Sequence, residues 1–87
     1  MNFEITKVDN SQIEQNSEEV PLMKRIDFIN DNLLYKGFAE PGVLPSSPSW
    51  RIIRITIGND GDVTEEYADG NANYDNVWNN RTILSYS

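Results

Sequence analysis

The chain contains neither cysteine nor histidine. Without cysteine it has no disulfide bond to support a small core, and cysteine usage does not indicate a redox compartment. A structural zinc site of the usual kind is also excluded, because its ligands are cysteine and histidine. The same absences remove the commonest general base and the thiol nucleophile. We therefore expect a non-enzymatic protein without a cofactor, although its 14 acidic residues leave open a carboxylate pair acting on a glycosidic bond.

Positive charge is scarce, since 7 Lys and Arg stand against 14 Asp and Glu for a net charge of −7. Binding to nucleic acid and to anionic membranes both depend on clustered cations, so neither partner is expected. Beyond Ser46 the only cations in the sequence are Arg51, Arg54 and Arg81. Arginine suits fixed, bidentate pairing better than lysine does. We predict that the arginines of this half make defined contacts.

Long apolar runs are missing too. None approaches the roughly 18 residues of a transmembrane helix, and the N-terminal sequence MNFEITKVDN has neither the basic nor the apolar region of a signal peptide. We expect a soluble protein made in the cytoplasm. With 87 residues the chain forms one domain at most. Such a chain buries only roughly 60 to 65% of the surface that its unfolded form exposes, so stability is expected to be modest unless partners contribute.

Residues 1–22 are interpreted as an extended N-terminal arm or linker. Phe3 and Ile5 alternate with polar residues as in a short strand. The run NSQIEQNSEE, residues 10–19, then has too little apolar side chain to offset the entropy of ordering. Because the apolar residues precede this linker, we predict an arm that docks Phe3, Ile5 and Val8 onto a neighbouring copy. An ordinary disordered terminus is the alternative.

Residues 23–87 are predicted to form a small β domain. Two strands are expected to meet at a turn over residues 30–32, where Asn and Asp tolerate left-handed backbone, and a helix through residues 22–35 is the alternative. WRIIRITI, residues 50–57, is the clearest strand and is apolar on both faces, so it is either central or packs one face on the core and the other on a partner. The loop GNDGD returns the chain into VTEEYA as a hairpin, and RTILSYS is expected to be a last strand. This pattern predicts an antiparallel β-sandwich or partly open barrel of about five or six strands.

DGNANYDNVWNNR, residues 69–81, has two interpretations. In the first, alternating side-chain oxygens match the first four ligand positions of a calcium loop, at Asp69, Asn71, Asn73 and Asp75. However, Tyr74 stands where that loop needs glycine, and a bidentate Glu is missing at its last position. We therefore predict no metal site, with these four residues as the only candidates.

The second interpretation is a short helix near residues 74–80. Tyr74, Val77, Trp78 and Arg81 have the i, i+3, i+4, i+7 spacing of one helical face, and Asn73 is a plausible N-cap. This interpretation explains more residues than the calcium loop, and makes Trp78 a core anchor and Arg81 a partner for a carboxylate. The predicted structural framework is Trp50, Arg54, Tyr74, Trp78 and Arg81.

One ordered string resembles a group of small virion proteins of tailed bacteriophages: YKGFAEPG … SWRIIRIT … GDVTEEYADGNANYDNVWNNRTILSYS. Members read approximately Y-x-G-x-A-x-P-G, then W-x-I-x-R-I, an acidic hairpin, and A-D-G-N-A-x-F/Y-x-x-V-W-x-x-R-x-x-L-x-Y. The resemblance covers about residues 24–87, and the N-terminal 22 residues lie outside it. The matching positions are Tyr35, Gly37, Ala39, Pro41, Gly42, Trp50, Ile52, Arg54, Gly70, Trp78, Arg81 and Tyr86.

The resemblance implies a non-enzymatic structural protein present in many copies per particle. We expect a capsid decoration or cement protein that docks on the major capsid protein and stabilises the shell. A tail or fibre component that helps attach the particle to its host is the alternative. A second alternative, from another class, is an intracellular phage protein that binds a host protein. The expected partners are other virion proteins and further copies of the chain, and the expected location is the virion, after synthesis in the host cytoplasm.

Overall fold

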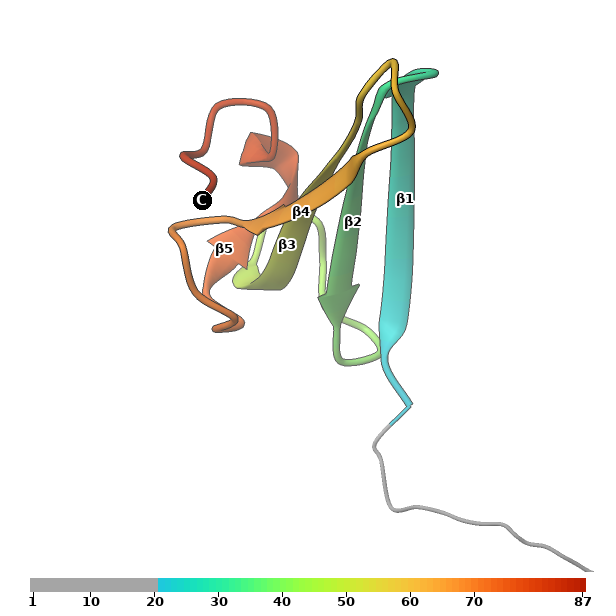
Figure 1. Cartoon of the computed structure of the whole chain (residues 1–87). Coiled ribbons are helices and arrows are strands. Elements are labelled where there is room, and N and C mark those ends of the chain that lie inside the picture. Colours follow the sequence, from blue (N-terminus) through green and yellow to red (C-terminus); the bar gives the residue numbers. More distant parts are fainter. Residues whose placement is uncertain (1–20) are drawn as a thin grey trace, which may run out of the picture.

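The computed structural model describes residues 21–87 and shows a mainly β protein (Figure 1). The arm predicted over residues 1–22 therefore lies almost wholly outside the described residues, as do its anchors Phe3, Ile5 and Val8. Five strands and one short 3-10 helix follow in chain order: β1 (Met23–Asn30), β2 (Leu33–Ala39), β3 (Pro48–Ile57), β4 (Val63–Tyr67), β5 (Asn76–Val77) and η1 (Trp78–Asn80).

Consecutive strands pair antiparallel in the order β1-β2-β3-β4. The predicted turn between β1 and β2 is confirmed, but residues 30–32 have none of the left-handed backbone expected there, and the alternative helix over residues 22–35 is wrong. The Asn30 side chain accepts a hydrogen bond from the Asn32 amide at 2.7 Å, and the Asn32 side chain donates to the Ile57 carbonyl at 2.7 Å. The hairpin between β3 and β4 is confirmed as well, with Gly61 supplying a positive φ of 92° in its loop.

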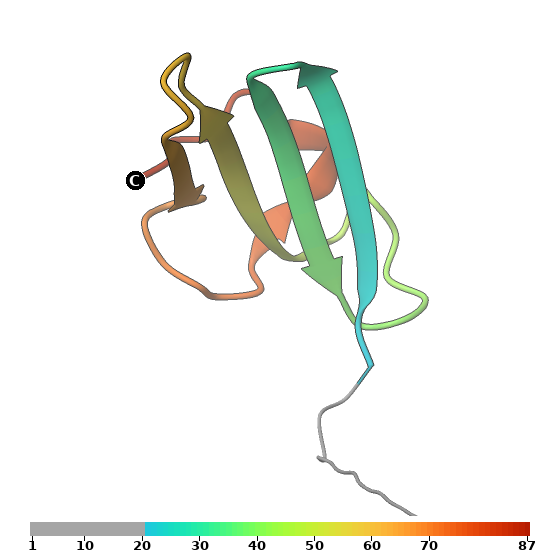
Figure 2. The ribbon, with the colours of Figure 1, turned by 45° about the vertical axis from the view of Figure 1, so that its right-hand side comes forward.

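The sheet is antiparallel and open. Within the described residues β1 and β4 lie at opposite ends of the main strand order, so the sheet does not close into a barrel. β5 pairs with the start of β3, where Trp50 stands opposite Asn76. Figure 2 shows β5 and η1 behind the plane of β1, β2 and β3, so the C-terminal segment covers one face of the sheet.

The helix predicted near residues 74–80 is largely replaced by other structure. Residues 76–77 are the strand β5, and only Trp78–Asn80 form a single 3-10 turn. Asn, Asp, Val and aromatic residues make up most of this stretch, and all are poor helix formers. The first residues of β3 meanwhile offer backbone groups for pairing, so extension against β3 is preferred to a helix.

The predicted last strand over residues 81–87 is reduced to one bridge between Ala68 and Tyr86. Turn hydrogen bonds interrupt its beginning, where the Ile83 amide donates to the Asn80 carbonyl at 2.9 Å. Only the last residues are extended enough to pair, and Tyr67 and Ser87 exchange two backbone hydrogen bonds of 3.0 and 3.2 Å. The chain end is thereby fixed beside β4.

Alternation along the strands divides the sheet into two faces. The closed face carries the buried core, and the residues of that core are Tyr35, Ala39, Trp50, Ile52, Ala68 and Trp78. The other face, here called the open face, is formed by β1 residues Lys24, Ile26 and Phe28, β2 residues Leu34, Lys36 and Phe38, β3 residues Arg51, Ile53, Ile55 and Ile57, and β4 residues Val63, Glu65 and Tyr67.

Candidate interaction surface

Two tryptophans hold the C-terminal segment on the closed face. The rings of Trp50 and Trp78 lie 5.8 Å apart between centroids and are tilted by 39°, as aromatic pairs prefer. Trp50 has no solvent exposure, and its indole nitrogen donates to the Leu44 carbonyl at 3.0 Å. Both rings lie over Gly37, where an added Cβ would come within 2.5 Å of the Trp78 ring. The absence of a side chain at Gly37 is therefore what lets the segment pack so closely.

Arg81 ties the same segment to the edge strand β1. Its Nη2 lies 2.8 Å from Asp27 Oδ2, its Nε also donates to that oxygen, and its Nη1 donates to the Trp78 carbonyl at 3.2 Å. The guanidinium carbon lies 4.7 Å from the Trp78 ring centroid. The ion pair joins residues 54 positions apart in the chain.

Arg54 and Tyr86 form the second polar contact of the closed face. Arg54 Nη2 lies 2.6 Å from Glu66 Oε1 on the neighbouring strand, and its guanidinium lies 5.0 Å from the Tyr86 ring centroid. The Tyr86 hydroxyl donates to the Arg81 carbonyl at 2.8 Å. Burial raises the pKa of Tyr86 well above its ordinary value, and the nearby Tyr35 acts in the same direction. The hydroxyl is thus held in its neutral, hydrogen-bonding form.

The structure brings four of the five predicted framework residues to the closed face, and Tyr74 is the exception. Tyr74 is 40% exposed and lies on the opposite side, where the Arg51 guanidinium carbon is 4.6 Å from its ring centroid. The helical spacing that grouped Tyr74 with Trp78 does not apply, because the chain is extended through Asn76 and Val77.

The four calcium candidates lie in the loop between β4 and β5, and their polar groups bond mainly to neighbours. Asn71 Oδ1 accepts from the Asn73 amide at 3.0 Å, and Asp75 Oδ1 accepts from the Asn76 side chain at 3.2 Å. Asp69 has a positive φ of 61°, as a turn residue of this type tolerates. Residues 21–87 contain no group of three or more acidic side chains placed to hold a metal ion.

The open face is apolar but uncovered by the part of the chain described. Cross-strand pairing places Phe28, Leu34 and Ile55 in one row, and Ile26, Lys36 and Ile53 in the next. Phe28 is 72%, Val63 59% and Ile26 50% exposed, whereas Ile53 at the centre is buried. Contiguous apolar side chains on a surface commonly mark a contact site.

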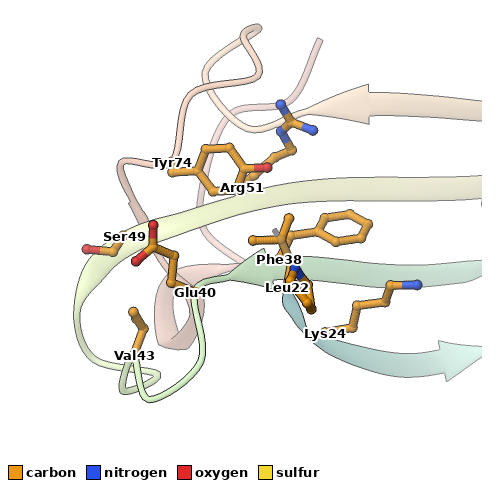
Figure 3. Close-up of a pocket in the computed structure, with 9 residues that line it drawn as sticks. Leu22, Lys24, Phe38, Glu40, Val43, Ser49, Arg51 and Tyr74 are labelled. Atoms are coloured by element: carbon orange, nitrogen blue, oxygen red, sulfur yellow. The ribbon is translucent and has the colours of Figure 1, made fainter. Parts of the chain in front are cut away.

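One end of the open face is cationic and hollowed (Figure 3). The Nζ atoms of Lys24 and Lys36 lie 5.9 and 5.6 Å from the Phe38 ring centroid. Phe38, Lys24 and Arg51 line a pocket together with Leu22 and Glu40. The whole chain is strongly acidic, so this positive charge is confined to one end of the open face.

The sequence indicated that β3 is apolar on both faces, with a partner on the second face as one interpretation, but it did not indicate which side chains of β1 and β2 complete that surface. The sequence pattern of this surface was visible, since Ile26 and Phe28 alternate with polar residues on β1 and Leu34 follows on β2. Their common face depends on the register Phe28–Leu34–Ile55, which the pairing of three separate strands fixes. The missing step was the register between strands.

Comparisons with protein-family models, with curated proteins and with solved structures return no match for this chain. Within residues 21–87 no helix has the length and apolar character needed to cross a membrane.

Proposed function

We propose that the chain is a non-enzymatic structural component of a tailed-bacteriophage particle, most specifically a capsid decoration protein that docks on the major capsid protein. The observation that carries this proposal is the open face, where Phe28, Val63 and Ile26 stay at least half exposed on a sheet whose other face is packed. A surface of this kind favours association over catalysis. The resemblance over residues 24–87 supports the choice of a phage particle.

The closed face supports the same proposal by giving the sheet a fixed shape. Trp50 and Trp78 pack over Gly37, and Arg81 pairs with Asp27 on the edge strand. A partner therefore meets a sheet whose backbone is already held in place, which lowers the entropy lost on binding. In a decoration protein, contacts made through the open face would add buried area across joints between capsid subunits.

Quantitative mass spectrometry of purified particles tests the function. A decoration protein is expected in hundreds of copies per particle. Tens of copies or fewer would instead favour a tail or fibre component, and absence from purified particles would favour an intracellular phage protein that binds a host protein. Either result overturns the capsid proposal.

Particle binding by variants tests which surface is used. Phe28→Glu places a charge on the open face and is expected to abolish binding, whereas Ile83→Glu is the matched control because Ile83 is 78% exposed in the C-terminal turn. Deletion of residues 1–20 is expected to leave a folded domain that no longer binds particles, since Phe3, Ile5 and Val8 are the proposed arm anchors. Binding retained after the deletion contradicts arm anchoring but not the open face.

A further inference from the structure

The open face combines exposed apolar side chains with a local cluster of positive charge. Residues 21–87 leave Ile26, Phe28 and Val63 between 50% and 72% exposed. Lys24, Lys36 and Arg51 make up three of the seven cations of the whole chain. An occupant that fits this face must therefore offer apolar side chains and negative charge together.

The first 20 residues of the same chain have this composition. Their apolar residues include Phe3, Ile5 and Val8, and one lysine stands against five acidic residues: Glu4, Asp9, Glu14, Glu18 and Glu19. A second copy placed face to face would offer the same three cations with only Glu65 and the pocket residue Glu40 as acids, which is poorer complementarity. The charge and apolar content favour the N-terminal segment as the occupant.

The chain also enters the described structure at the cationic end of the open face. Pro21 and Leu22, which directly follow the segment, line the pocket with Lys24, Phe38 and Arg51 (Figure 3). Residues 10–20, at about 3.3 Å each, can span about 36 Å. That exceeds the length of the eight-residue strand β1, roughly 26 Å, so residues 3–9 can reach the whole face.

We propose that residues 3–9 dock on the open face of their own chain, with Glu18 and Glu19 beside Lys24 and Arg51. Tethering gives the segment an effective concentration in the millimolar range, which a second molecule reaches only in concentrated solution. On a particle, a capsid protein would displace this segment from the open face, which frees Phe3, Ile5 and Val8 to anchor on a neighbouring subunit. The inference concerns the free protein, so it holds or fails independently of the proposed function.

Paramagnetic broadening in the full-length protein tests the proposal. Since the sequence has no cysteine, Glu65→Cys on β4 gives a single spin-label site on the open face. Thr82→Cys, exposed in the C-terminal turn, gives the matched control. We expect the amide signals of residues 3–9 to lose more than half of their intensity with the label at position 65 and much less with the label at position 82. Equal broadening from both labels means that the segment samples both sides, and overturns the proposal.

Two variants and one mixture complete the test. Phe3→Ser/Ile5→Ser leaves residues 21–87 unchanged and is expected to abolish the specific broadening, as is Lys24→Glu/Lys36→Glu on the face. Broadening that persists in the first variant contradicts docking through these side chains. In a mixture of ¹⁵N-labelled protein without a spin label and unlabelled protein carrying it, we expect no broadening. Broadening in that mixture shows docking on another copy and overturns docking within one chain.

Discussion

Gly37→Ala is the substitution that most directly tests how the closed face is built. Gly37 lies on β2 with an ordinary backbone, so alanine meets no conformational barrier there. Its Cβ would lie 2.5 and 2.6 Å from two atoms of the Trp78 ring and 3.0 Å from the Trp50 ring. Both rings are buried and packed against each other, so neither moves without disturbing the core.

The expected effect is a net destabilisation of about 1–2 kcal/mol. Forcing an extra methyl into a packed core costs about 1–3 kcal/mol. Replacing glycine by alanine also lowers the entropy of the unfolded chain, which offsets about 0.4–1 kcal/mol. For a small protein with a urea m-value near 1 kcal/mol/M, the unfolding midpoint should fall by about 1–2 M. Tryptophan fluorescence is a suitable signal, because Trp50 and Trp78 are both buried.

Gly58→Ala is the matched control for this experiment. Gly58 also has no positive φ, and its added Cβ would lie 3.0 Å from Oδ1 of the exposed Asp60 side chain, which accepts from the Asp62 amide and needs to shift by only a few tenths of an ångström. We expect a change within about 0.5 kcal/mol. In a Trp78→Leu background, Gly37→Ala should cost clearly less than in the natural chain, because the ring it meets is gone. A Gly37→Ala protein as stable as the natural chain would refute the packing argument.

Three further predictions concern single side chains. Arg81→Lys should lower the free energy of unfolding by about 1 kcal/mol in urea titrations. Lysine lacks the planar set of donors with which Arg81 binds both Asp27 and the Trp78 carbonyl. Unchanged stability would show that a positive charge at this position is enough to hold the C-terminal segment. Burial raises the pKa of Tyr86 in the folded protein above its value of about 10 in the unfolded chain. The contribution of Tyr86 to folding stability is therefore complete below about pH 10 and is lost as the pH rises above it. The urea midpoint should therefore fall between pH 9 and 11.5 in the natural chain and less in Tyr86→Phe, and equal slopes would contradict this. In a protein that lacks residues 1–20, Phe28→Ser should change the urea midpoint little, because the ring is 72% exposed on the remaining structure, and a loss above about 2 kcal/mol would show that another part of the protein covers the ring.

The regular part of the fold was predictable from local patterns. β-branched residues, glycine loops and the Asn-rich turn specify β1 to β4 and both hairpins without reference to distant residues. The C-terminal segment was predicted less well. Tyr74, Val77 and Trp78 fit a helical face by spacing, but pairing of Asn76 opposite Trp50 prevails, and that contact joins residues far apart in the chain.

The contacts of the two sheet faces were also hard to predict from the sequence, because they join residues far apart in the chain. Arginine content after Ser46 predicted defined contacts, and Arg54 and Arg81 both form ion pairs. Their partners were not predictable, because Glu66 meets Arg54 through the register of β3 and β4, and Asp27 meets Arg81 only where the C-terminal segment packs over the sheet. The open face required the same information, since Phe28, Leu34 and Ile55 become neighbours only through two strand pairings.

If the open face binds a partner as proposed, the two faces separate stability from association within one thin sheet. Substitutions at Gly37, Trp78 or Arg81 act on the closed face and should change the free energy of unfolding. Substitutions at Phe28 or Lys24 act on the open face, where exposed side chains contribute little to the fold and are available to a partner. The described sheet has a packed core on its closed face only. A molecule or segment that covers the open face would bury a second layer of apolar side chains. If the N-terminal segment or a capsid subunit occupies the open face as proposed, it should therefore raise the unfolding midpoint of the protein.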